Sequence, residues 1–470
     1  MNDRRRPSRP PKSRPPKRKP DPARPVDIDP VRMAAVETLR AVRERDAYAN
    51  LALPPLLKQR AITGRDAALA TELTYGTCRA QGLLDEVIAA CSSRPVAEME
   101  PAMVDALRVG VYQLLRTRIP AHAAVASTVD IVRFENGTKL SGFANAVLRK
   151  VTEKDEQGWL DELAPDAATD PIGNLALRHA HPRWIAQAFA DSLGGEQELA
   201  DALAADDARP AVHLTARPGE ISADELAAIT GGDPAPYSPY GVRLEAGAGD
   251  PGDLEPVREG FATVQDEGSQ LVALAATRPE VGGSDARWLD LCAGPGGKAA
   301  LLGALASLDG GALDAVEQTA HRADLVRRAT EGLPVAVHVA DGREPGLEPG
   351  YDRVLVDAPC TGLGALRRRP EARWRRKPSD IGELSKLQRE LLLSAIRLTR
   401  PGGIVAYVVC SPHLAETEGV VADAVRRTGA EEIDARPWFP DVPDLGEGPS
   451  VQLWPHRHGT DAMFCALLRA

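Results

Sequence analysis

The chain has 470 residues, of which 43% are hydrophobic and 4% aromatic, and its formal net charge is −10. This length and apolar content suffice for two or three domains whose cores consist mainly of Ala, Leu and Val. Because no apolar run reaches the roughly 18 residues of a membrane span and the N-terminus lacks the apolar stretch of a signal peptide, we expect a cytoplasmic protein without membrane contact.

The N-terminal segment 1–27 differs from the rest of the chain in composition. Its first 25 residues hold ten Lys or Arg, two Asp and eight Pro. Such a segment has too few apolar side chains to form a core. We predict a disordered, basic, proline-rich tail that adds a nonspecific, salt-sensitive attraction to phosphates.

Residues 28–155 are predicted to be almost wholly helical. Apolar side chains recur at helical spacing from Val31 to Leu39, and similar runs follow at 66–91, 102–117 and 122–134. The segment Ile119–His122 separates two of these helices, because proline fits the first turn of a helix. Taken alone, this half indicates a helical bundle without showing its purpose.

The segment Arg287–Lys298 predicts an apolar strand, a tight glycine turn and the start of a helix. This is the first unit of a doubly wound sheet, in which glycines let the backbone approach a ligand. The pattern matches neither the dinucleotide motif nor the P-loop, which leaves a small nucleoside ligand such as S-adenosylmethionine, or a turn needed only for packing. The candidate binding residues are Cys292, Ala293, Gly294, Pro295, Gly296, Gly297 and Lys298.

Four further apolar runs predict strands with polar or reactive residues at their carboxyl ends. These runs are 311–317 with Glu317, 335–340 with Asp341, 352–356 with Asp357, and 403–409 with Cys410. A carboxylate at Glu317 suits ribose hydroxyls, although a solvent-facing or helix-capping role is the alternative. Asp341 is placed to meet an adenine amino group. The clustering at strand ends predicts one site.

Cys360 and Cys410 each follow a predicted strand, and such a pair suits chemistry on a pyrimidine ring carbon. Carbon 5 of cytosine is a poor nucleophile until a thiolate adds to carbon 6. A second group must then help to remove the thiolate. Any single cysteine is otherwise a small buried hydrophobe. The chain has no C-x-x-C spacing among its six cysteines, so we expect no metal site.

Together these segments resemble the S-adenosylmethionine-dependent RNA 5-methylcytosine methyltransferases, over about residues 175–470. The resemblance is carried by residues 264–270, 290–298, 357–364, 410–411 and 453–456. It implies that Cys410 is the nucleophile, that Cys360 assists release, that Asp357 contacts the base edge and borders the donor, and that Lys298 lies near both. The chain departs from the family pattern, without loss of a reacting group, at Ala299, Glu317, Val409, Ala462 and Met463.

The runs 119–133 and 141–149 look like the NusB-like RNA-binding domain found in one branch of this family, which modifies a cytosine of small-subunit (16S) ribosomal RNA. The resemblance implies a multidomain protein and a ribosomal RNA partner; we also expect a monomer. Its domains are an all-α NusB-like bundle over 28–155, linker helices and a small α/β RNA-binding subdomain over 156–255, and an α/β Rossmann-like class I methyltransferase domain over 256–470. Methylation of transfer RNA and a noncatalytic RNA-binding role remain alternatives.

The segment 367–377 holds seven cations and one acidic residue, and it begins seven positions after Cys360. A solvated charged loop is the plain interpretation, but beside a target pocket we expect it to grip the RNA backbone. Trp374 is expected to pack inward rather than to stack on a base. The predicted RNA-binding residues are Arg367, Arg368, Arg369, Arg373, Arg375 and Arg376.

Overall fold

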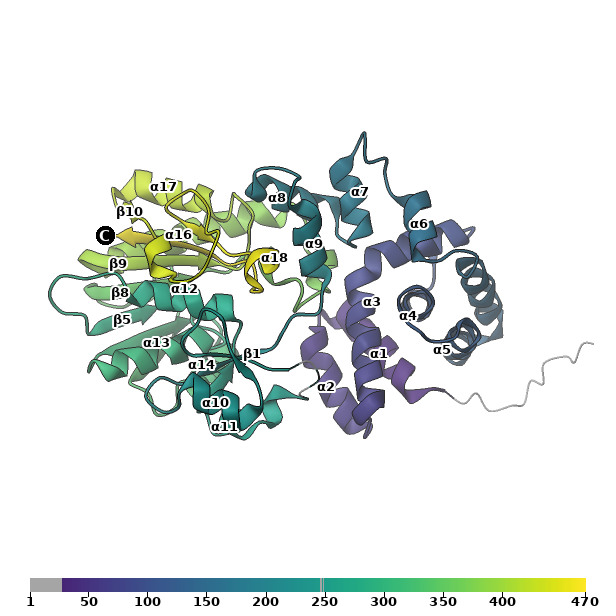
Figure 1. Ribbon diagram of the computed structural model, residues 1–470, viewed down its shortest axis with the longest axis horizontal. Helices are drawn as coiled ribbons and strands as arrows, with labels where there is room; N and C mark the ends of the chain where they lie inside the picture. The colour runs from purple at the N-terminus through teal and green to yellow at the C-terminus, as the bar shows by residue number, and fades with distance from the viewer. Residues whose placement is uncertain (1–27, 246, 248) are drawn as a thin grey trace, which may run out of the picture.

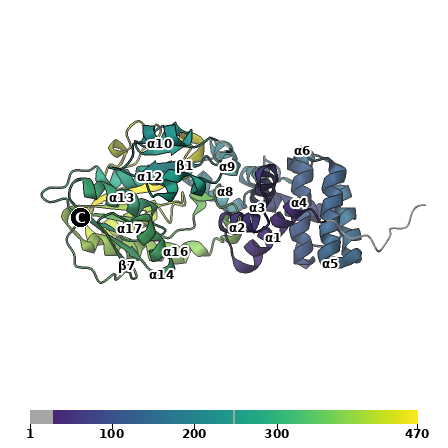
Figure 2. The ribbon, with the colours of Figure 1, turned by 90° about the horizontal axis from the view of Figure 1, so that it is seen from below.

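The computed structural model describes residues 28–245, 247 and 249–470, so the predicted tail 1–27 lies outside the described residues. An all-helical part and a part built on two β-sheets lie end to end, with α8 (Arg183–Leu193) and α9 (Leu199–Asp207) between them (Figures 1 and 2). The expected multidomain fold, helical bundle plus Rossmann-like domain, is confirmed. No helix among the described residues is long and apolar enough to cross a membrane.

Local signals set the limits of the N-terminal helices. Asp29 caps the first helix by accepting hydrogen bonds from the backbone N of Val31 and Arg32. Pro120 immediately precedes the long fifth helix, where the sequence predicts a break between two helices. One apolar core joins these helices. Their bounds are α1 (Pro30–Arg45), α2 (Ala49–Gln59), α3 (Gly64–Cys91), η1 (Val96–Glu98), α4 (Pro101–Arg116), α5 (Ala121–Val151) and α6 (Glu156–Leu163).

A small sheet follows the linker helices α7 (Pro171–Arg178), α8 and α9. Its strand order is β2-β3-β1-β4, and all its pairs are antiparallel. Because β4 belongs to this sheet, we place the end of the small subdomain after Val264 rather than at residue 255. Its elements are β1 (His213–Ala216), α10 (Ala223–Thr230), β2 (Asp233–Pro234), β3 (Gly241–Arg243), η2 (Pro251–Asp253), α11 (Glu255–Arg258) and β4 (Ala262–Val264).

The large sheet has the order β10-β12-β9-β8-β5-β6-β7, and β11 pairs with β12. Its strands are β5 (Arg287–Asp290), β6 (Ala312–Glu317), β7 (Val335–Val339), β8 (Tyr351–Asp357), β9 (Thr399–Val409), β10 (Glu431–Ile433), β11 (Val451–Gln452) and β12 (Phe464–Arg469). The strands β5 to β9 are mutually parallel, and β12 runs antiparallel to β9. The chain order reverses between β5 and β8, which is where such sheets bind ligands.

Helices cover both faces of this sheet (Figure 1), because both faces of its central strands are apolar. In β9, Ile404 and Ala406 join one core layer, whereas Val405 and Tyr407 join the other. The helical elements are α12 (Glu267–Thr277), α13 (Gly297–Leu308), α14 (Ala320–Ala329), η3 (Leu363–Ala365), α15 (Ala372–Arg375), α16 (Asp380–Leu398), α17 (Glu418–Thr428), η4 (Arg436–Trp438) and α18 (Pro455–His458).

Candidate active site

The two candidate cysteines meet at the carboxyl edge of the parallel strands. Cys410 directly follows β9, and Cys360 lies in the loop after β8. Their Sγ atoms are 3.5 Å apart although the residues are 50 positions apart in the chain. Both residues are partly buried. The geometry allows one sulfur to act on a group that the other has bound.

Lys298 and Asp357 form an ion pair beside the cysteines. The Nζ of Lys298 donates to Oδ2 of Asp357 at 2.8 Å, and the lysine comes from the start of α13. Burial lowers the pKa of Lys298, but the charge and hydrogen bond of Asp357 outweigh it, so the pKa is raised overall. The lysine therefore stays charged, and Asp357, whose side chain is 29% exposed, keeps an oxygen for a ligand.

Cys360 is held as a neutral thiol. The hydrogen bond with Cys410, burial, and the negative charges around it raise the pKa of Cys360 well above its ordinary value. Because two sulfurs 3.5 Å apart resist a double negative charge, the pair carries one negative charge at most in the working pH range.

The glycine turn after β5 has the backbone geometry of a ligand cradle. Gly296 has φ +117°, and a Cβ atom there would lie 2.8 Å from the Cβ of Ala329. At the end of β5, Asp290 is buried and its Oδ2 has no hydrogen-bond partner. Burial and the neighbouring charge of Asp357 raise the pKa of Asp290 to about 7. A close backbone and an unpaired acidic oxygen fit the cationic, nucleoside-bearing donor that the sequence predicts.

The structure places the two carboxylates that are predicted to bind the methyl donor at neighbouring strand ends. Glu317 ends β6 and is buried, with Oε1 accepting from the N and Oγ1 of Thr319. Its Oε2 lies 3.5 Å from the guanidinium of Arg322, beside the glycine turn. Asp341 follows β7 and is partly exposed, and Arg343 donates to both its oxygens. Their roles toward ribose and adenine stay predictions.

The structure places Arg367 and Arg368 of the predicted RNA-binding segment in ion pairs within the protein. Arg367 donates to Asp461 and to the carbonyl of Gly459, and Arg368 pairs with Asp461 and Asp266. Their guanidinium groups neutralise carboxylates that the fold brings from distant parts of the chain. Both guanidinium groups are thus occupied by carboxylates of the protein, and their contacts with RNA stay predictions.

Arg373 joins the helical and catalytic parts. Its side chain is fully buried and bonds Asp206 at 2.9 Å, Asp207 at 3.1 Å and the carbonyl of Ala180 at 2.9 Å. These partners lie in the linker helices, which the local sequence around Arg373 does not show. In this structure the fully buried arginine connects the two parts, and its predicted contact with RNA stays a prediction.

The rest of this segment docks on the first helices. Trp374 packs inward as expected: its Nε1 donates to the carbonyl of Cys78 at 2.7 Å, and its ring fills the space beside Gly82. Arg375 donates to the carbonyl of Val42 at 2.8 Å. Arg376 is half-buried and donates to Thr361, next to Cys360. Arg369, which lies over the ring of Tyr48, is the predicted RNA-binding arginine that is exposed.

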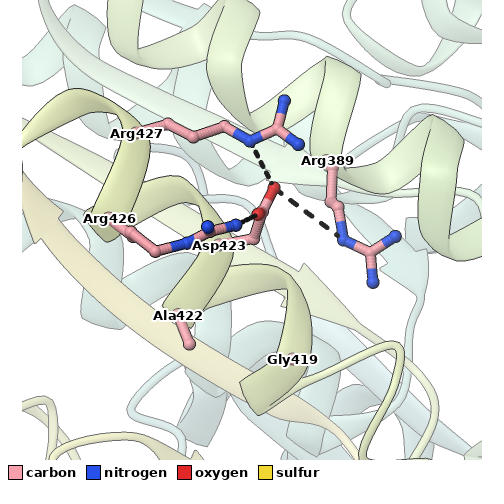
Figure 3. Close-up of a pocket in the computed structure, with 6 residues that line it drawn as sticks. All are labelled: Arg389, Gly419, Ala422, Asp423, Arg426 and Arg427. Carbon is pink, nitrogen blue, oxygen red and sulfur yellow. Dashed lines mark hydrogen bonds and ion pairs between the residues drawn. The ribbon is translucent and has the colours of Figure 1, made fainter.

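A separate hollow of about 440 Å³ lies on α16 and α17 (Figure 3). Asp423 in its floor faces Arg389, Arg426 and Arg427. Its carboxylate is engaged by these guanidinium groups, and the residues around it include no nucleophile. The hollow therefore offers no alternative site for the chemistry of the cysteine pair.

Sequence reasoning missed the residues that hold the two cysteine loops together. These are Thr361, Gln388, Ser411 and Glu416. Thr361 and Ser411 each follow a candidate cysteine directly, which was a usable signal. Glu416 lies in the loop before α17, and nothing in the local sequence distinguishes it from an exposed loop carboxylate.

Comparison with family models accounts for both parts of the chain. The model described as 16S rRNA methyltransferase RsmB/F matches residues 281–469, and the NusB family model matches residues 29–153. The first range contains the cysteine pair, the Lys298–Asp357 pair and the glycine turn. The second contains α1 to α5.

Two relatives match almost the whole chain. A Mycobacterium tuberculosis protein (strain H37Rv) with a provisional methyltransferase name is 62% identical over 94% of this chain and 97% of its own length. The ribosomal RNA small subunit methyltransferase B of Salmonella arizonae is 33% identical over 85% of this chain and 90% of its own length. The first name carries no substrate, whereas the second does.

Solved structures share the fold. The crystal structure of PH0851 superposes with a TM-score of 0.78 and 24% identity, over 94% of this chain and 99% of that one. The structure of NSun6 from Pyrococcus horikoshii has a TM-score of 0.52 and 19% identity, and covers 61% of this chain and 98% of that one. The architecture of both parts of the chain thus has precedent in experiment.

Proposed function

Because the chain belongs to the RsmB/F family of S-adenosylmethionine-dependent RNA cytosine-C5 methyltransferases and carries its N-terminal NusB domain, we propose that it methylates carbon 5 of a cytosine in small-subunit (16S) ribosomal RNA. The observation that carries the proposal is the pair of sulfurs 3.5 Å apart at the strand ends. We further propose that it acts in the cytoplasm as a monomer.

Cys410 is proposed as the nucleophile. Its thiolate adds to carbon 6 of the cytosine, and the electron pair of the carbon 5–carbon 6 double bond makes carbon 5 nucleophilic. The raised pKa of Cys360 favours this assignment, because it keeps Cys360 as a neutral thiol, which is a poor nucleophile. Asp357 is proposed to accept a hydrogen bond from the base edge, and Lys298 orients that carboxylate through the 2.8 Å contact.

Cys360 is proposed to assist release. S-adenosylmethionine, when bound at the glycine turn, supplies the methyl group. The proton on carbon 5 then leaves to a base, the carbon 5–carbon 6 double bond forms again, and Cys410 departs as a thiolate. Cys360 contacts the departing sulfur, so it is placed to help this step.

The target base must leave its stack before carbon 6 can reach Cys410. Extrusion from a helix costs a few kcal/mol and less from a loop, so we propose an unpaired or loop cytosine as the target. Transfer RNA is the second candidate, because the chemistry of the cysteine pair would be the same. The match to the NusB family favours ribosomal RNA.

A denaturing gel tests this assignment. Cys360→Ala is incubated with S-adenosylmethionine and 16S ribosomal RNA, beside wild type, Cys410→Ala and the double variant. We expect a slow covalent enzyme–RNA band that requires Cys410. Absence of the band, together with no transfer of labelled methyl by the wild type to 16S RNA, would exclude this substrate; label transfer to transfer RNA would then select the second candidate.

A further inference from the structure

A buried carboxylate lies between the two cysteine loops. Glu416 is in the loop that connects β9 to α17, and its side chain is fully shielded from solvent. A charged group at such a position is costly unless several donors surround it. The partners of Glu416 therefore indicate what its position contributes.

Each carboxylate oxygen of Glu416 accepts two hydrogen bonds. Oε1 accepts from the backbone N of Thr361 at 2.8 Å and from Nε2 of Gln388 at 3.0 Å. Oε2 accepts from Oγ of Ser411 at 2.7 Å and from Oγ1 of Thr361. These four donors are all neutral, so the carboxylate acts as a hydrogen-bond centre rather than as half of an ion pair.

The donors come from three segments that surround the cysteine pair. Thr361 directly follows Cys360, and Ser411 directly follows Cys410. Gln388 of α16 uses the same amide nitrogen to reach the carbonyl of Pro359 at 2.9 Å, on the other side of Cys360. One buried side chain thus ties both cysteine loops to each other and to a helix.

The main chain of Glu416 is anchored as well. The hydroxyl of Tyr407, near the carboxyl end of β9, donates to the carbonyl of Glu416 at 2.6 Å. Tyr407 is fully buried in the core, so it couples the loop to the rigid sheet. A centre fixed to the sheet can hold the two loops in one arrangement.

We propose that Glu416 is a positioning residue that holds the sulfurs of Cys360 and Cys410 at contact distance. The proposal deepens the proposed function and rests on it for its catalytic consequence, whereas its geometric consequence can be measured without RNA. Glu416 itself touches no reacting atom. It acts through Thr361 and Ser411.

The charge of Glu416 adds a second effect in the same direction. After the contact with Cys410 and burial, the negative charges of Cys410 and Glu416 help to raise the pKa of Cys360. A carboxylate at this position therefore favours the neutral thiol at Cys360. An uncharged side chain of the same shape would keep most of the links but lose this effect.

Three substitutions separate these contributions. Glu416→Ala removes every link and leaves the backbone N of Thr361 without its acceptor. Glu416→Gln keeps the shape, and its amide group can still bond the hydroxyls of Thr361 and Ser411, which accept as well as donate. Glu418→Ala is the matched control, because Glu418 has the same side chain two positions away but is exposed.

The first readout is the rate of disulfide formation between Cys360 and Cys410. The thiol oxidant diamide takes two electrons and two protons from the pair, and mass spectrometry of peptides identifies the linked cysteines. We expect wild type and Glu418→Ala to react at the same rate, Glu416→Gln within about threefold, and Glu416→Ala at least about 10-fold more slowly. Far-ultraviolet circular dichroism confirms that each variant is folded.

The second readout is catalysis with RNA. We expect Glu416→Ala to lower kcat about 100-fold with little change in the KM for S-adenosylmethionine, because a misplacement of about 1 Å costs this much. We also expect part of the variant to remain as a covalent adduct through Cys410, since release needs Cys360 in place. Loss of folding alone would not produce an adduct.

Two results would overturn the proposal. One is a folded Glu416→Ala that forms the disulfide at the wild-type rate, whatever its activity. The second result applies if Glu416→Ala fails to fold. In that case, wild-type rates of both disulfide formation and methylation in Glu416→Asp, whose side chain is one methylene shorter, would overturn the proposal. A wild type that is inactive on RNA but whose disulfide rate still depends on Glu416 would support the positioning and refute only the proposed function.

Discussion

Two neighbouring stretches of the chain, 357–362 and 367–376, contain chemically conspicuous residues, yet the fold uses them in opposite ways. In the first, Asp357 and Cys360 lie at the carboxyl edge of the sheet and retain accessible surface. In the second, Arg367 and Arg373 are buried in ion pairs. A reactive site needs atoms that remain available for a ligand. In a structural contact between two parts of a protein, by contrast, each buried charge must be neutralised by a partner.

The largest effect should come from replacing Cys410, whose sulfur contacts Cys360 of the first stretch. Cys410→Ala should lower methyl transfer at least about 1,000-fold, because it removes the proposed nucleophile and Cys360 is held as a neutral thiol. Labelled methyl incorporation into RNA measures this loss. Cys465→Ala is the control: that cysteine is buried in β12, so we expect lower stability with the wild-type kcat. Equal losses in both variants would contradict a special role for Cys410.

The next largest effect should come from removing the Arg373 contacts that connect the helical and catalytic parts. Arg373→Met leaves the buried Asp206 without its guanidinium partner, whereas Asp207 keeps its contact with Arg116, and an uncompensated buried charge costs about 3–5 kcal/mol. Thermal unfolding and limited proteolysis between the helical and catalytic parts measure the loss. The exposed Arg369→Ala is the comparison and should leave the unfolding midpoint nearly unchanged. A stable Arg373→Met would show that the connection between the two parts does not depend on this arginine.

The pH dependence of stability should show that Asp290, unlike the carboxylates that pair with the arginines of the second stretch, has a carboxyl group that is not neutralised by an ion pair. Its pKa rises from 3.8 when unfolded to about 7 when folded, so between these values the folded state binds more protons. The contribution of Asp290 to stability therefore falls as the pH rises through this window, by at most about 4 kcal/mol, and levels off above it.

Asp290→Asn should remove this dependence. The difference in unfolding midpoint between wild type and variant, measured from pH 4 to 8, should shift against the wild type as the pH rises. A difference that stays constant over this range would mean that Asp290 is ionised throughout.

The smallest effect should come from Arg369, the exposed arginine of the second stretch. Arg369→Ala should weaken RNA binding a few-fold and reduce the salt dependence of log K by about one ion contact. Filter binding at several salt concentrations measures both quantities. An unchanged salt slope would remove Arg369 from the candidate RNA contacts. Of the arginines in this stretch, the half-buried Arg375 and Arg376 would then remain as candidates.

Much of the fold follows from local signals in the chain. The strands before Asp290, Glu317, Asp357 and Cys410 lie where their apolar runs predict them. The helix break at Pro120 is also observed. These signals are local because a strand's apolar run and a proline's missing N–H act within a few residues. The same local reasoning brought the two cysteines to one edge of the sheet, since parallel strands end together.

The arginines and Glu416 show where local reasoning stopped. The sequence shows seven cations around residue 370, but whether each meets water, phosphate or a carboxylate depends on partners such as Asp206 and Asp461, roughly 90 to 170 positions away. Likewise, only the fold places Glu416 between the two cysteine loops.

By itself, then, the sequence determined which polar and reactive residues lie at the strand ends, the glycine turn after β5 and the division into a helical and an α/β part, because each depends on short-range patterns of residue type. Only the tertiary structure decided which charged residues are consumed as structural contacts and which side chain ties the cysteine loops. The free energy of a buried charge is set by the groups around it in space, and those groups come from segments far apart in the chain.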